Sequence, residues 1–396
     1  MKLILLSRLA GTTSGGTPSR GNKAYYGGDI PWLKSGELPD GEIFSAEEMI
    51  TLQGLENSSA KLLPIGTLLL AMYGATVGKL GILTFPAATN QAICAITPNE
   101  NLERDYLFYW LLSIRNKLII TSFGGAQPNI SQTVIRDLRV PWVPISEQRQ
   151  IAVRLKAQLA EVETARQAAQ VQVREAELLR RRLLQAAFDS LVDVKLKKFG
   201  EWVTSYRNGF GRRPGTEETG PIVLRIADVS SGQIDLSKPR RGFVSDKEAN
   251  TYRLEPDNLL FIRVNGAREI VGRCCVVGAD IPHDVIFNDH LIRVCLKSGI
   301  DAEFARFCAG SPAARALIEE AASTSAGQLT INQQVIESIG IPDLPLDKQR
   351  QFVQRLKAQL AEADAITQAA AAQLAEIECL PQRILAQAFT PQGSPS

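Results

Sequence analysis

Basic, amide, hydroxyl and aromatic side chains cluster in a few glycine-rich segments, and these are the side chain types that contact nucleic acids. Lysine and arginine neutralise phosphates, while arginine, asparagine and glutamine can form paired hydrogen bonds with base edges. One such cluster is SGGTPSRGNKAYY at 14–26. In the first third of the chain, the candidate DNA-contacting residues are Thr17, Ser19, Arg20, Lys23, Tyr25, Lys34, Lys79, Asn90 and Gln91.

The second half of the chain holds a further set of candidates. Arginines occur in RNGFGRRPG at 207–215, near 238–241, and in RVNGAREIVGR at 263–273. The set consists of Arg207, Arg212, Arg213, Arg225, Arg240, Arg241, Arg263, Asn265, Arg268, Arg273, Asn288 and His290. Any single member can equally be solvated surface charge. We interpret the arginines at 180–182 differently, as cations near a helix end that complement the helix dipole.

Catalytic motifs are missing from the sequence, so we predict no catalytic residue. The run GATVGK at 74–79 is one residue shorter than a phosphate-binding loop, and Leu80 stands where Ser or Thr would bind magnesium, so it predicts a turn between strands. No Gly-x-Gly-x-x-Gly follows a strand, and no Asn/Asp-Pro-Pro-Tyr run is present to accept a flipped adenine. A possible zinc set matches no standard spacing: Cys274, Cys275, His283, His290 and Cys295. We therefore expect neither a cofactor nor a metal.

An internal duplication shows how these candidates must be positioned. The segment 144–188 returns without a gap at 345–389, 201 residues later, with 23 of 45 positions identical. Weaker similarity at the same offset extends upstream, to about residues 127 and 328. The chain is therefore predicted to consist of a globular unit, a long helix, a second globular unit and a second long helix.

Both copies of the repeat have the features of long helices. Each follows a proline, contains good helix formers and no glycine, and has Ser146 or Asp347 at a predicted N-cap. Pro381 replaces Arg180, so the second helix should kink or end near it. Nonpolar residues recur four and three apart, as in a coiled-coil seam. The predicted helix-pairing residues are Leu155, Leu159, Val162, Ala169, Val173, Leu356, Leu360, Ala363, Ala370, Leu374 and Ile377.

Neither helix can bury its seam alone. Helices of this length span roughly 60 Å at about 1.5 Å per residue. Because a globular unit separates them, we predict that they pair antiparallel within the chain and hold the globular units at opposite ends. The alternative is that each helix packs on its own globular unit.

The remaining segments read as mixed domains. In 1–143 and 190–344, short β-rich runs such as TLLLAM and NLLFIRV are punctuated by Gly, Pro, Asn and Asp, and a helical stretch follows near each junction. The predicted fold class is α+β, with two such domains separated by two long helices that form an intramolecular antiparallel coiled coil. The predicted segments are 1–143, 144–189, 190–344 and 345–390, with a tail at 391–396.

Composition limits the function classes only weakly. The chain has 396 residues, of which 45% are hydrophobic and 22% charged, as in an ordinary folded protein. With 44 basic and 42 acidic residues, bulk charge does not indicate a nucleic-acid binder, so that interpretation rests on local clusters. Six cysteines in this length do not suggest a disulfide framework, and no stretch resembles a membrane span or a secretory signal. We expect a cytoplasmic protein without a membrane partner.

Several phrases, taken in order, resemble the specificity subunits of type I restriction–modification systems, and the resemblance covers nearly the whole chain. In the first half they are SGGTPSRGNKAYYGGDIPWLKSGEL at 14–38, LLPIGTLLLAMYGATVGKLGIL at 62–83, ATNQAI at 88–93 and AQPNIS at 126–131. In the second half they are LLFIRVNGAREIVGR at 259–273, FNDHLIRV at 287–294 and INQQVIESIGIPDLPLDKQRQF at 331–352. The second unit has GFGRRPG where the family phrase GGTPS would stand.

This resemblance implies two target recognition domains, here 1–143 and 190–344, which read the two halves of a bipartite double-stranded DNA site. It implies a non-catalytic subunit that binds two modification (methyltransferase) subunits and restriction subunits with nuclease and translocase activity. The paired helices would fix the spacer between the half-sites and dock the methyltransferases.

Two other functions remain open on the sequence. One is a non-catalytic coiled-coil scaffold whose two β-rich domains bind proteins, and such a scaffold would select no consensus from a random DNA pool. The other is a fused enzyme that acts on DNA by itself when given S-adenosylmethionine or magnesium.

Overall fold

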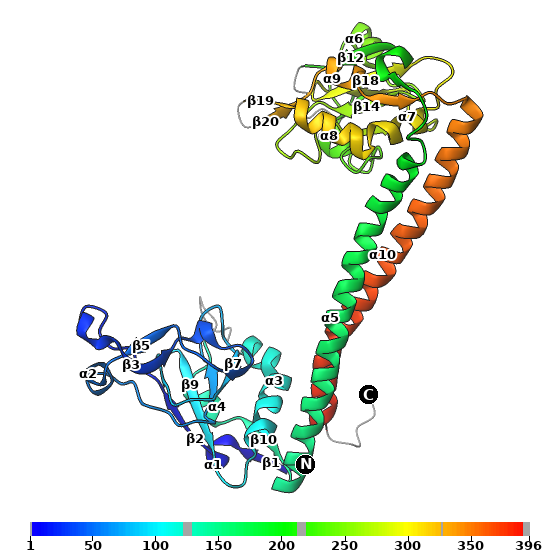
Figure 1. Cartoon of the computed structure of the whole chain (residues 1–396). Helices are drawn as coiled ribbons and strands as arrows, with labels where there is room; N and C mark the ends of the chain where they lie inside the picture. The colour runs from blue at the N-terminus through cyan, green and yellow to red at the C-terminus, as the bar shows by residue number, and fades with distance from the viewer. Residues whose placement is uncertain (1, 122–128, 212–218, 326–327, 391–396) are drawn as a thin grey trace. The chain divides into compact units, whose positions relative to one another are not determined.

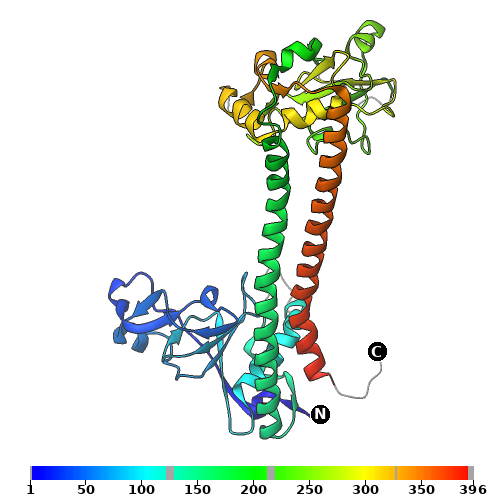
Figure 2. The same ribbon diagram turned by 45° about the vertical axis from the view of Figure 1, so that its right-hand side comes forward.

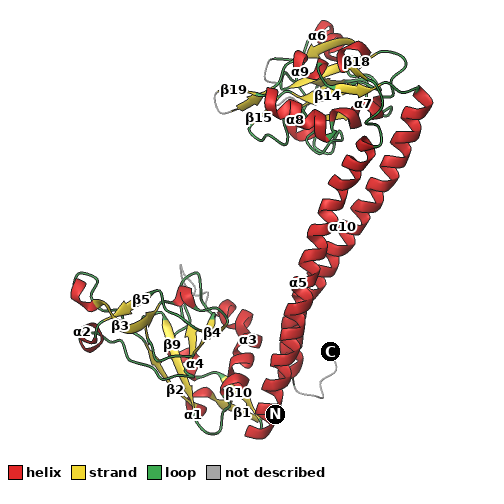
Figure 3. Ribbon diagram, in the orientation of Figure 1, coloured by secondary structure: helices red, strands yellow, loops and turns green. Residues whose placement is uncertain are grey.

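The structure, a computed structural model, describes residues 2–121, 129–211, 219–325 and 328–390. It divides into two compact units, of which the first comprises Met1–Val171 and Ala371–Ser396 and the second comprises Gln172–Ala370. Each unit contains one globular part and portions of both long helices (Figures 1 and 3). Within the described ranges, none of the helices has the length and apolar character needed to cross a membrane.

Antiparallel and parallel pairings combine in the globular part of the first unit. One sheet has the strand order β2-β9-β6-β7-β4 and another the order β5-β3-β8, while β1 pairs with β10. The strands are β1 (Lys2–Leu5), β2 (Ala10–Ser14), β3 (Tyr26–Leu33), β4 (Gly41–Ile43), β5 (Glu48–Ile50), β6 (Leu68–Ala71), β7 (Leu80–Leu83), β8 (Ala88–Thr89), β9 (Ile93–Pro98) and β10 (Arg139–Trp142). The helices are α1 (Leu6–Leu9), α2 (Leu52–Glu56), α3 (Arg104–Thr121) and α4 (Gln132–Arg136). The turn predicted at 74–79 is confirmed, since it joins β6 to β7.

The second unit has a related architecture. Its main sheet has the order β12-β18-β14-β16, β13 pairs in parallel with β17, and β11 pairs with β21. The strands are β11 (Leu196–Lys198), β12 (Val203–Asn208), β13 (Ile222–Leu224), β14 (Leu259–Ile262), β15 (Val264–Asn265), β16 (Cys274–Val276), β17 (Val285–Phe287), β18 (Leu291–Leu296), β19 (Ser323–Ser325), β20 (Gln328–Thr330) and β21 (Gly340–Pro342). The helices are α6 (Asp246–Tyr252), α7 (Ala302–Ala309), α8 (Pro312–Ala321) and α9 (Gln333–Glu337).

The two long helices are α5 (Ile145–Asp189) and α10 (Leu346–Phe389). They begin one residue before the predicted caps, so Ser146 and Asp347 lie in the first turn and the N-cap prediction was wrong. The carbonyls of Pro144 and Pro345 instead accept the first helical hydrogen bonds. The arginines at 180–182 lie in the last three turns of α5, as predicted, although the final turn itself contains no basic residue.

Pro381 does not end α10, which continues to Phe389. Proline removes one backbone donor from a helix, but packing can hold the turns that follow it. Leu385 beyond the proline is 4% exposed, and Ile384 and Phe389 pack against the same hydrophobic core of the first unit. This packing explains why α10 does not end early, which was one of the two predicted alternatives, the other being a kink.

The long helices pack against each other in antiparallel order (Figures 1 and 2). In the first unit, Leu155 near the start of α5 and Leu385 near the end of α10 belong to one core. In the second unit, Leu356 near the start of α10 and Phe188 near the end of α5 belong to another. The predicted coiled coil is therefore confirmed, and each helix start also packs on its own globular part.

The predicted pairing residues lie at the buried or half-buried positions of these helices. Leu155, Val162, Ala169, Leu356, Leu360 and Ala363 are buried, whereas Leu159, Val173, Ala370, Leu374 and Ile377 are half-buried. Outside the seam, Arg180 of α5 donates to both carboxylate oxygens of Asp364 of α10, at 2.7 and 2.8 Å. This arginine therefore contacts the partner helix.

Candidate nucleic-acid interface

In the first unit, the loop after β2 lies directly against the segment that joins β8 to β9. The Gly16 N–H donates to the Thr89 carbonyl at 2.8 Å. A Cβ atom on Gly15 would lie 2.2 Å from the same carbonyl oxygen, so only glycine fits there. This close approach brings Thr17 beside Gln91, whose side-chain oxygen accepts a hydrogen bond from the Thr17 hydroxyl. Two candidates from distant segments therefore meet.

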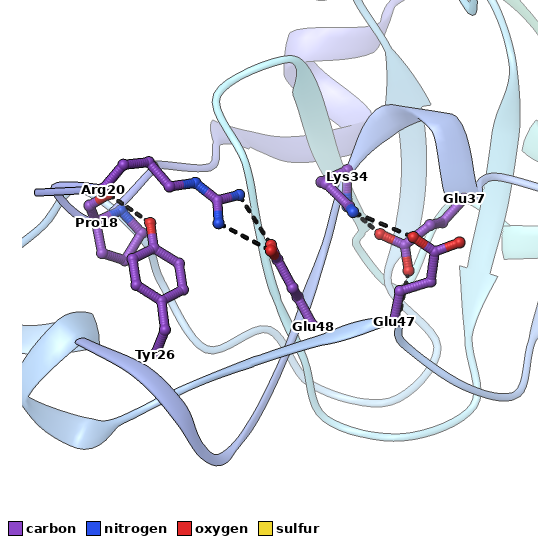
Figure 4. A network of polar contacts seen from close by, with 7 residues as sticks. All are labelled: Pro18, Arg20, Tyr26, Lys34, Glu37, Glu47 and Glu48. Carbon is purple, nitrogen blue, oxygen red and sulfur yellow. Dashed lines mark hydrogen bonds and ion pairs between the residues drawn. The ribbon is translucent and has the colours of Figure 1, made fainter. Parts of the chain in front are cut away.

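Arg20 is held in place by a carboxylate and two aromatic rings. Its guanidinium donates to both oxygens of Glu48, at 2.8 and 2.9 Å (Figure 4). It also lies over the rings of Tyr26 and Trp32. The hydrogen bond with Glu48 raises the pKa of Arg20 and lowers the pKa of Glu48. The Arg20 side chain is nevertheless 54% exposed. A cation of fixed orientation is thus presented to solvent.

Lys34 precedes the 3-10 turn η2 (Ser35–Glu37), and its backbone is fixed by that turn. The Lys34 N–H donates to the Glu37 carboxylate at 2.8 Å, and the same carboxylate accepts from the Glu47 N–H at 2.8 Å. The Lys34 ammonium donates to the Glu47 carboxylate at 3.1 Å, which raises the pKa of Lys34 (Figure 4). Because Glu47 is 72% exposed, this ion pair is solvent-screened and contributes little to stability.

The other candidates of the first unit lie around these loops. The Asn90 side chain accepts a hydrogen bond from the Ala92 N–H at 3.2 Å, so it supports the loop that presents Gln91. Ser19 and Lys23 are exposed, and Tyr25 and Lys79 are half-buried. Lys79 immediately precedes β7.

The second unit has the same backbone arrangement with other residues. In both units a glycine packs against the segment between two strands, and we call this arrangement the backbone frame. The Phe210 N–H donates to the Phe287 carbonyl at 2.8 Å, and a Cβ atom on Gly209 would lie 2.0 Å from the Asn288 carbonyl oxygen. The Asn288 N–H donates to the Leu224 carbonyl at 3.0 Å, just as the Asn90 N–H donates to the Leu33 carbonyl at 2.9 Å. Gly209 and Asn288 therefore match Gly15 and Asn90.

Arg225 occupies the position that matches Lys34. It precedes the 3-10 turn η4 (Ile226–Asp228), and its N–H donates to the Asp228 carboxylate at 2.7 Å. Its guanidinium binds both oxygens of that carboxylate, at 2.7 and 3.0 Å, which raises the pKa of Arg225. Asp228 is only 12% exposed. Arg225 thus pairs with a largely buried acid, whereas Lys34 pairs with an exposed one.

The strand β5 has a basic counterpart in the second unit. In the first unit Trp32 of β3 pairs with Glu48, while in the second the Val223 N–H of β13 donates to the Arg240 carbonyl at 2.8 Å. An arginine therefore replaces a glutamate at this edge. The neighbouring Arg241 donates to the Asp284 carboxylate and the Gly220 carbonyl, both at 2.6 Å, and the Arg240 side chain is exposed.

Candidates from two segments, 263–265 and 288–290, lie near the end of β14. The Arg263 N–H donates to the His290 carbonyl at 2.8 Å, and the Arg263 guanidinium donates to the Asp289 carbonyl at 3.1 Å. The Asn288 side-chain oxygen is buried and has no hydrogen-bond partner among the described residues. Asn265 accepts from the Ala267 N–H at 2.9 Å, which stabilises the adjoining turn.

The last candidates of the second unit are more scattered. Arg273 matches Lys79, because each follows a glycine of positive φ, Gly272 or Gly78. The Arg273 guanidinium donates to the Glu269 carbonyl at 2.6 Å and the Ser230 carbonyl at 3.3 Å. The side chains of Arg207 and Arg268 are exposed. Arg212 and Arg213 lie outside the described residues.

The cysteines and histidines do not gather into a metal site. In the parts of the chain that the structure describes, no group of three or more His, Cys, Asp or Glu side chains could hold a metal ion. Cys275 is buried, and this desolvation raises the pKa of its thiol to about 12. Such a thiol stays protonated at neutral pH and packs as a small apolar group.

Sequence reasoning missed the residues that orient the candidate cations. Glu37 and Asp228 fix the turns after Lys34 and Arg225, and Glu48 holds Arg20. A cation followed three residues later by an acid was the available signal, present as KSGE at 34–37 and RIAD at 225–228. The correspondence of whole phrases in the two globular parts was predicted, but individual pairs such as Lys34 and Arg225 were missed, because the loops differ in length and a single fixed offset does not align them.

Comparison with known proteins identifies the relatives of this chain. Residues 9–172 match the sequence family described as the type I restriction modification DNA specificity domain. The StySPI type I restriction enzyme specificity subunit of Salmonella potsdam is 28% identical over 380 residues, which cover 91% of this chain and 81% of that protein. The EcoKI specificity subunit of Escherichia coli strain K12 is 26% identical over 382 residues, which cover 91% and 82%.

Solved structures share the fold along the whole chain. The HsdS subunit from Thermoanaerobacter tengcongensis aligns with a TM-score of 0.63 at 18% identity, over 98% of this chain and 96% of that one. A chain from a study of assembly and conformational transition in a type I restriction–modification system aligns with a TM-score of 0.74 at 19% identity, over 98% and 97%. Residues 9–172 thus match a DNA specificity domain, and the chain as a whole is similar to the specificity subunits of type I restriction–modification systems.

Proposed function

We propose that the chain reads a bipartite double-stranded DNA target, with one half-site for each globular part. The observation that carries this proposal is that one backbone frame occurs twice with different polar side chains at matching positions, such as Lys34 and Arg225, or Gln91 and Asp289. Because the two backbone frames are alike, they place side chains at matching positions in the same geometry. Different side chains at those positions bind different base edges. The recognition domains are 1–143 and 190–344.

The candidate residues divide by the chemistry of their surroundings. Lys34, tied only to an exposed carboxylate, suits a phosphate contact. Arg20 is planar and held by Glu48, so its guanidinium suits a defined base or phosphate geometry. One cation in a solvent-exposed ion pair and another held by a carboxylate and two rings support an interface that combines phosphate positioning with base reading.

The helical segments 144–189 and 345–390 act as a ruler in this proposal. The 45 residues of α5 span roughly 65 Å at about 1.5 Å per residue. Half-sites about one helical turn apart, ~34 Å, face the same side of DNA and fall within that length. The ruler would therefore fix the length of the unspecified spacer.

The partners in this proposal are two modification subunits, followed by restriction subunits. The chain itself performs no catalysis and acts in the cytoplasm, where the methyltransferase subunits flip the target adenine out of the duplex. Support comes from relatives that are named as specificity subunits of type I restriction enzymes.

Methylation mapping tests the proposal. Cells that co-express this chain with its methyltransferase subunits should methylate adenine within a two-part consensus separated by a gap of fixed length. Selection from a random DNA pool should give the same gapped consensus, whereas a protein-binding scaffold would select none. Purified chain supplied with S-adenosylmethionine or magnesium should neither modify nor cut DNA. A continuous consensus, or activity of the chain alone, would contradict the proposal.

A further inference from the structure

A buried glutamine joins the first turn of α5 to its globular part. The side-chain oxygen of Gln148 accepts from the Glu103 N–H at 2.8 Å. Its side-chain nitrogen donates to the Asn101 carbonyl at 3.0 Å and to the Val143 carbonyl at 2.8 Å. Gln148 is 0% exposed. One side chain therefore links the helix, the segment that enters it and the loop between β9 and α3.

The same contact is built a second time, at the start of α10. The side-chain oxygen of Gln349 accepts from the Asp301 N–H at 2.8 Å, and its nitrogen donates to the Gly299 and Leu344 carbonyls at 3.1 and 2.8 Å. Gln349 is also 0% exposed. The loops contacted, 99–103 and 299–301, differ in sequence, yet the bonding pattern is the same.

Because both glutamines are fully buried, the fold depends on all of their hydrogen bonds. Glutamine is mostly exposed in proteins, and a buried amide that loses its partners pays the cost of desolvation without compensation. Both N–H donors and the oxygen of each glutamine are satisfied by backbone groups. A small tilt of the helix would break them, so the bonds resist tilting.

Apolar packing at the same place cannot supply this directionality. Ile151 and Leu155 of α5 pack in one core, and Phe352 and Leu356 of α10 in the other. The hydrophobic effect is nearly non-directional and tolerates small rotations. The geometry of N–H···O bonds is much narrower, since they weaken steeply away from linearity. The glutamines therefore select one helix orientation among those that the apolar contacts allow.

We infer that Gln148 and Gln349 are positioning residues that set the spacer length accepted by the chain. Each fixes the angle between a long helix and the recognition domain that precedes it. The inference rests on the proposed function, because the ruler measures a defined DNA length only if each reading face is held rigidly on its own helix. Both glutamines act without touching DNA.

Gln148→Leu tests this role, because leucine has a similar volume but removes all three hydrogen bonds. The complete complex with its methyltransferase subunits is given DNA in which both half-sites are constant and the spacer is native, one base pair shorter or one longer. The preference of the variant for the native spacer should fall by about tenfold, with the half-site consensus unchanged. A general loss of folding would lower methylation of all three DNAs equally.

Matched variants make the outcome specific. Gln349→Leu should relax the spacer in the same way, whereas the exposed neighbours Gln150→Leu and Gln351→Leu should keep the native preference. Gln148→Glu keeps the acceptor for Glu103 but turns a carboxylate toward two carbonyls, so it should resemble Gln148→Leu. If both leucine variants keep the native spacer preference, this inference is overturned while the proposed function stands. If the unsubstituted complex has no gapped consensus, both are overturned.

Hydrogen exchange on the unsubstituted complex gives a second test that needs no variant. The Glu103 and Asp301 amides, bonded to buried glutamines, should exchange at least about a hundredfold more slowly than exposed loop amides, because exchange requires the bonds to open. Exchange at the rate of exposed loops would show that the glutamines do not hold the helices, and would overturn the inference.

Discussion

The two globular parts share a backbone frame but carry different side chains at its matching positions. Both press a glycine against the segment before a long strand, at Gly15 and Gly209, and both begin a 3-10 turn with a cation. The first part ties Lys34 to an exposed glutamate, while the second ties Arg225 to a largely buried aspartate. The frame rests on backbone hydrogen bonds, so side chains can change without disturbing it.

Charge at the edge beside this frame differs most. Glu48 of β5 faces Arg20 in the first part, whereas Arg240 and Arg241 occupy the matching segment of the second. An acid at a DNA-reading face repels phosphates but can accept a hydrogen bond from cytosine. The two parts therefore cannot be assigned equivalent base contacts, even where their backbones correspond.

Substitution of the glycines that form the shared backbone frame should change stability more than any other substitution considered below. Gly15→Ala and Gly209→Ala each place a Cβ atom about 2 Å from a carbonyl oxygen, so each should lower the free energy of unfolding by about 3 kcal/mol. Gly36→Ala and Gly266→Ala meet no atom within 4 Å and should change it by less than about 0.5 kcal/mol. Thermal unfolding measures the difference, and equal stability of all four variants would show that the frames are not packed as described.

A smaller effect concerns the two helices, where Pro381 matches Arg180. Proline inside a helix removes a hydrogen bond, so Pro381→Ala should raise the free energy of unfolding by about 2 kcal/mol. The reciprocal change, Arg180→Pro, should lower it by a similar amount. Chemical denaturation measures both, and Ala375→Gly provides a control for an ordinary exposed helical position. Destabilisation by Pro381→Ala would mean that the proline serves the packing of the last turns.

Alanine variants of Lys34 and Arg225 should both weaken DNA binding, but only the Arg225 variant should also lose stability. Lys34→Ala should weaken DNA binding about tenfold and lower the salt dependence by about one phosphate contact, with little change in stability. Arg225→Ala should in addition lower the free energy of unfolding by about 1–2 kcal/mol, because Asp228 loses its two hydrogen bonds from the guanidinium and keeps only that from the backbone N–H. Arg263→Ala should also weaken binding without altering assembly of the helices. Titrations across a salt series check this, and unchanged affinity refutes the assignments.

The ion pair between Arg20 and Glu48, at the acidic edge of the first globular part, should affect stability least. The hydrogen bond with Arg20 lowers the pKa of Glu48 below its ordinary 4.5, so the pair stabilises the fold above that pH. Its contribution is lost as the pH falls through the lowered pKa. Because the pair is solvent-screened, Glu48→Gln should cost at most about 0.5 kcal/mol at neutral pH and flatten this part of the stability profile. Glu56→Gln, at an exposed site, should leave the profile unchanged.

The long-range organisation was predictable from sequence because it repeats. A gapless duplication and a heptad seam define α5, α10 and their pairing, since both patterns are local and periodic. The partners of Arg20 and Arg225 were not predictable in the same way, because strand pairing in the fold brings Glu48 to Arg20. Gln148 and Gln349 were visible as identical residues, but nothing in the sequence reveals that a normally exposed side chain is buried. The early end predicted at Pro381 was wrong because helix propensity takes no account of the packing of the residues that follow the proline.

The division of the chain into units has a consequence for biosynthesis. The second unit is one continuous stretch, Gln172–Ala370, whereas the core of the first includes Leu385, and the ring of Tyr106 contacts that of Phe389. A ribosome delivers residues in order, and N-terminal domains ordinarily fold first. The core of the first unit is therefore completed only after the second unit and the last turns of α10 have been made. Until then, the apolar surface that Leu385 and Phe389 cover, which includes Tyr106, lacks its final packing partners.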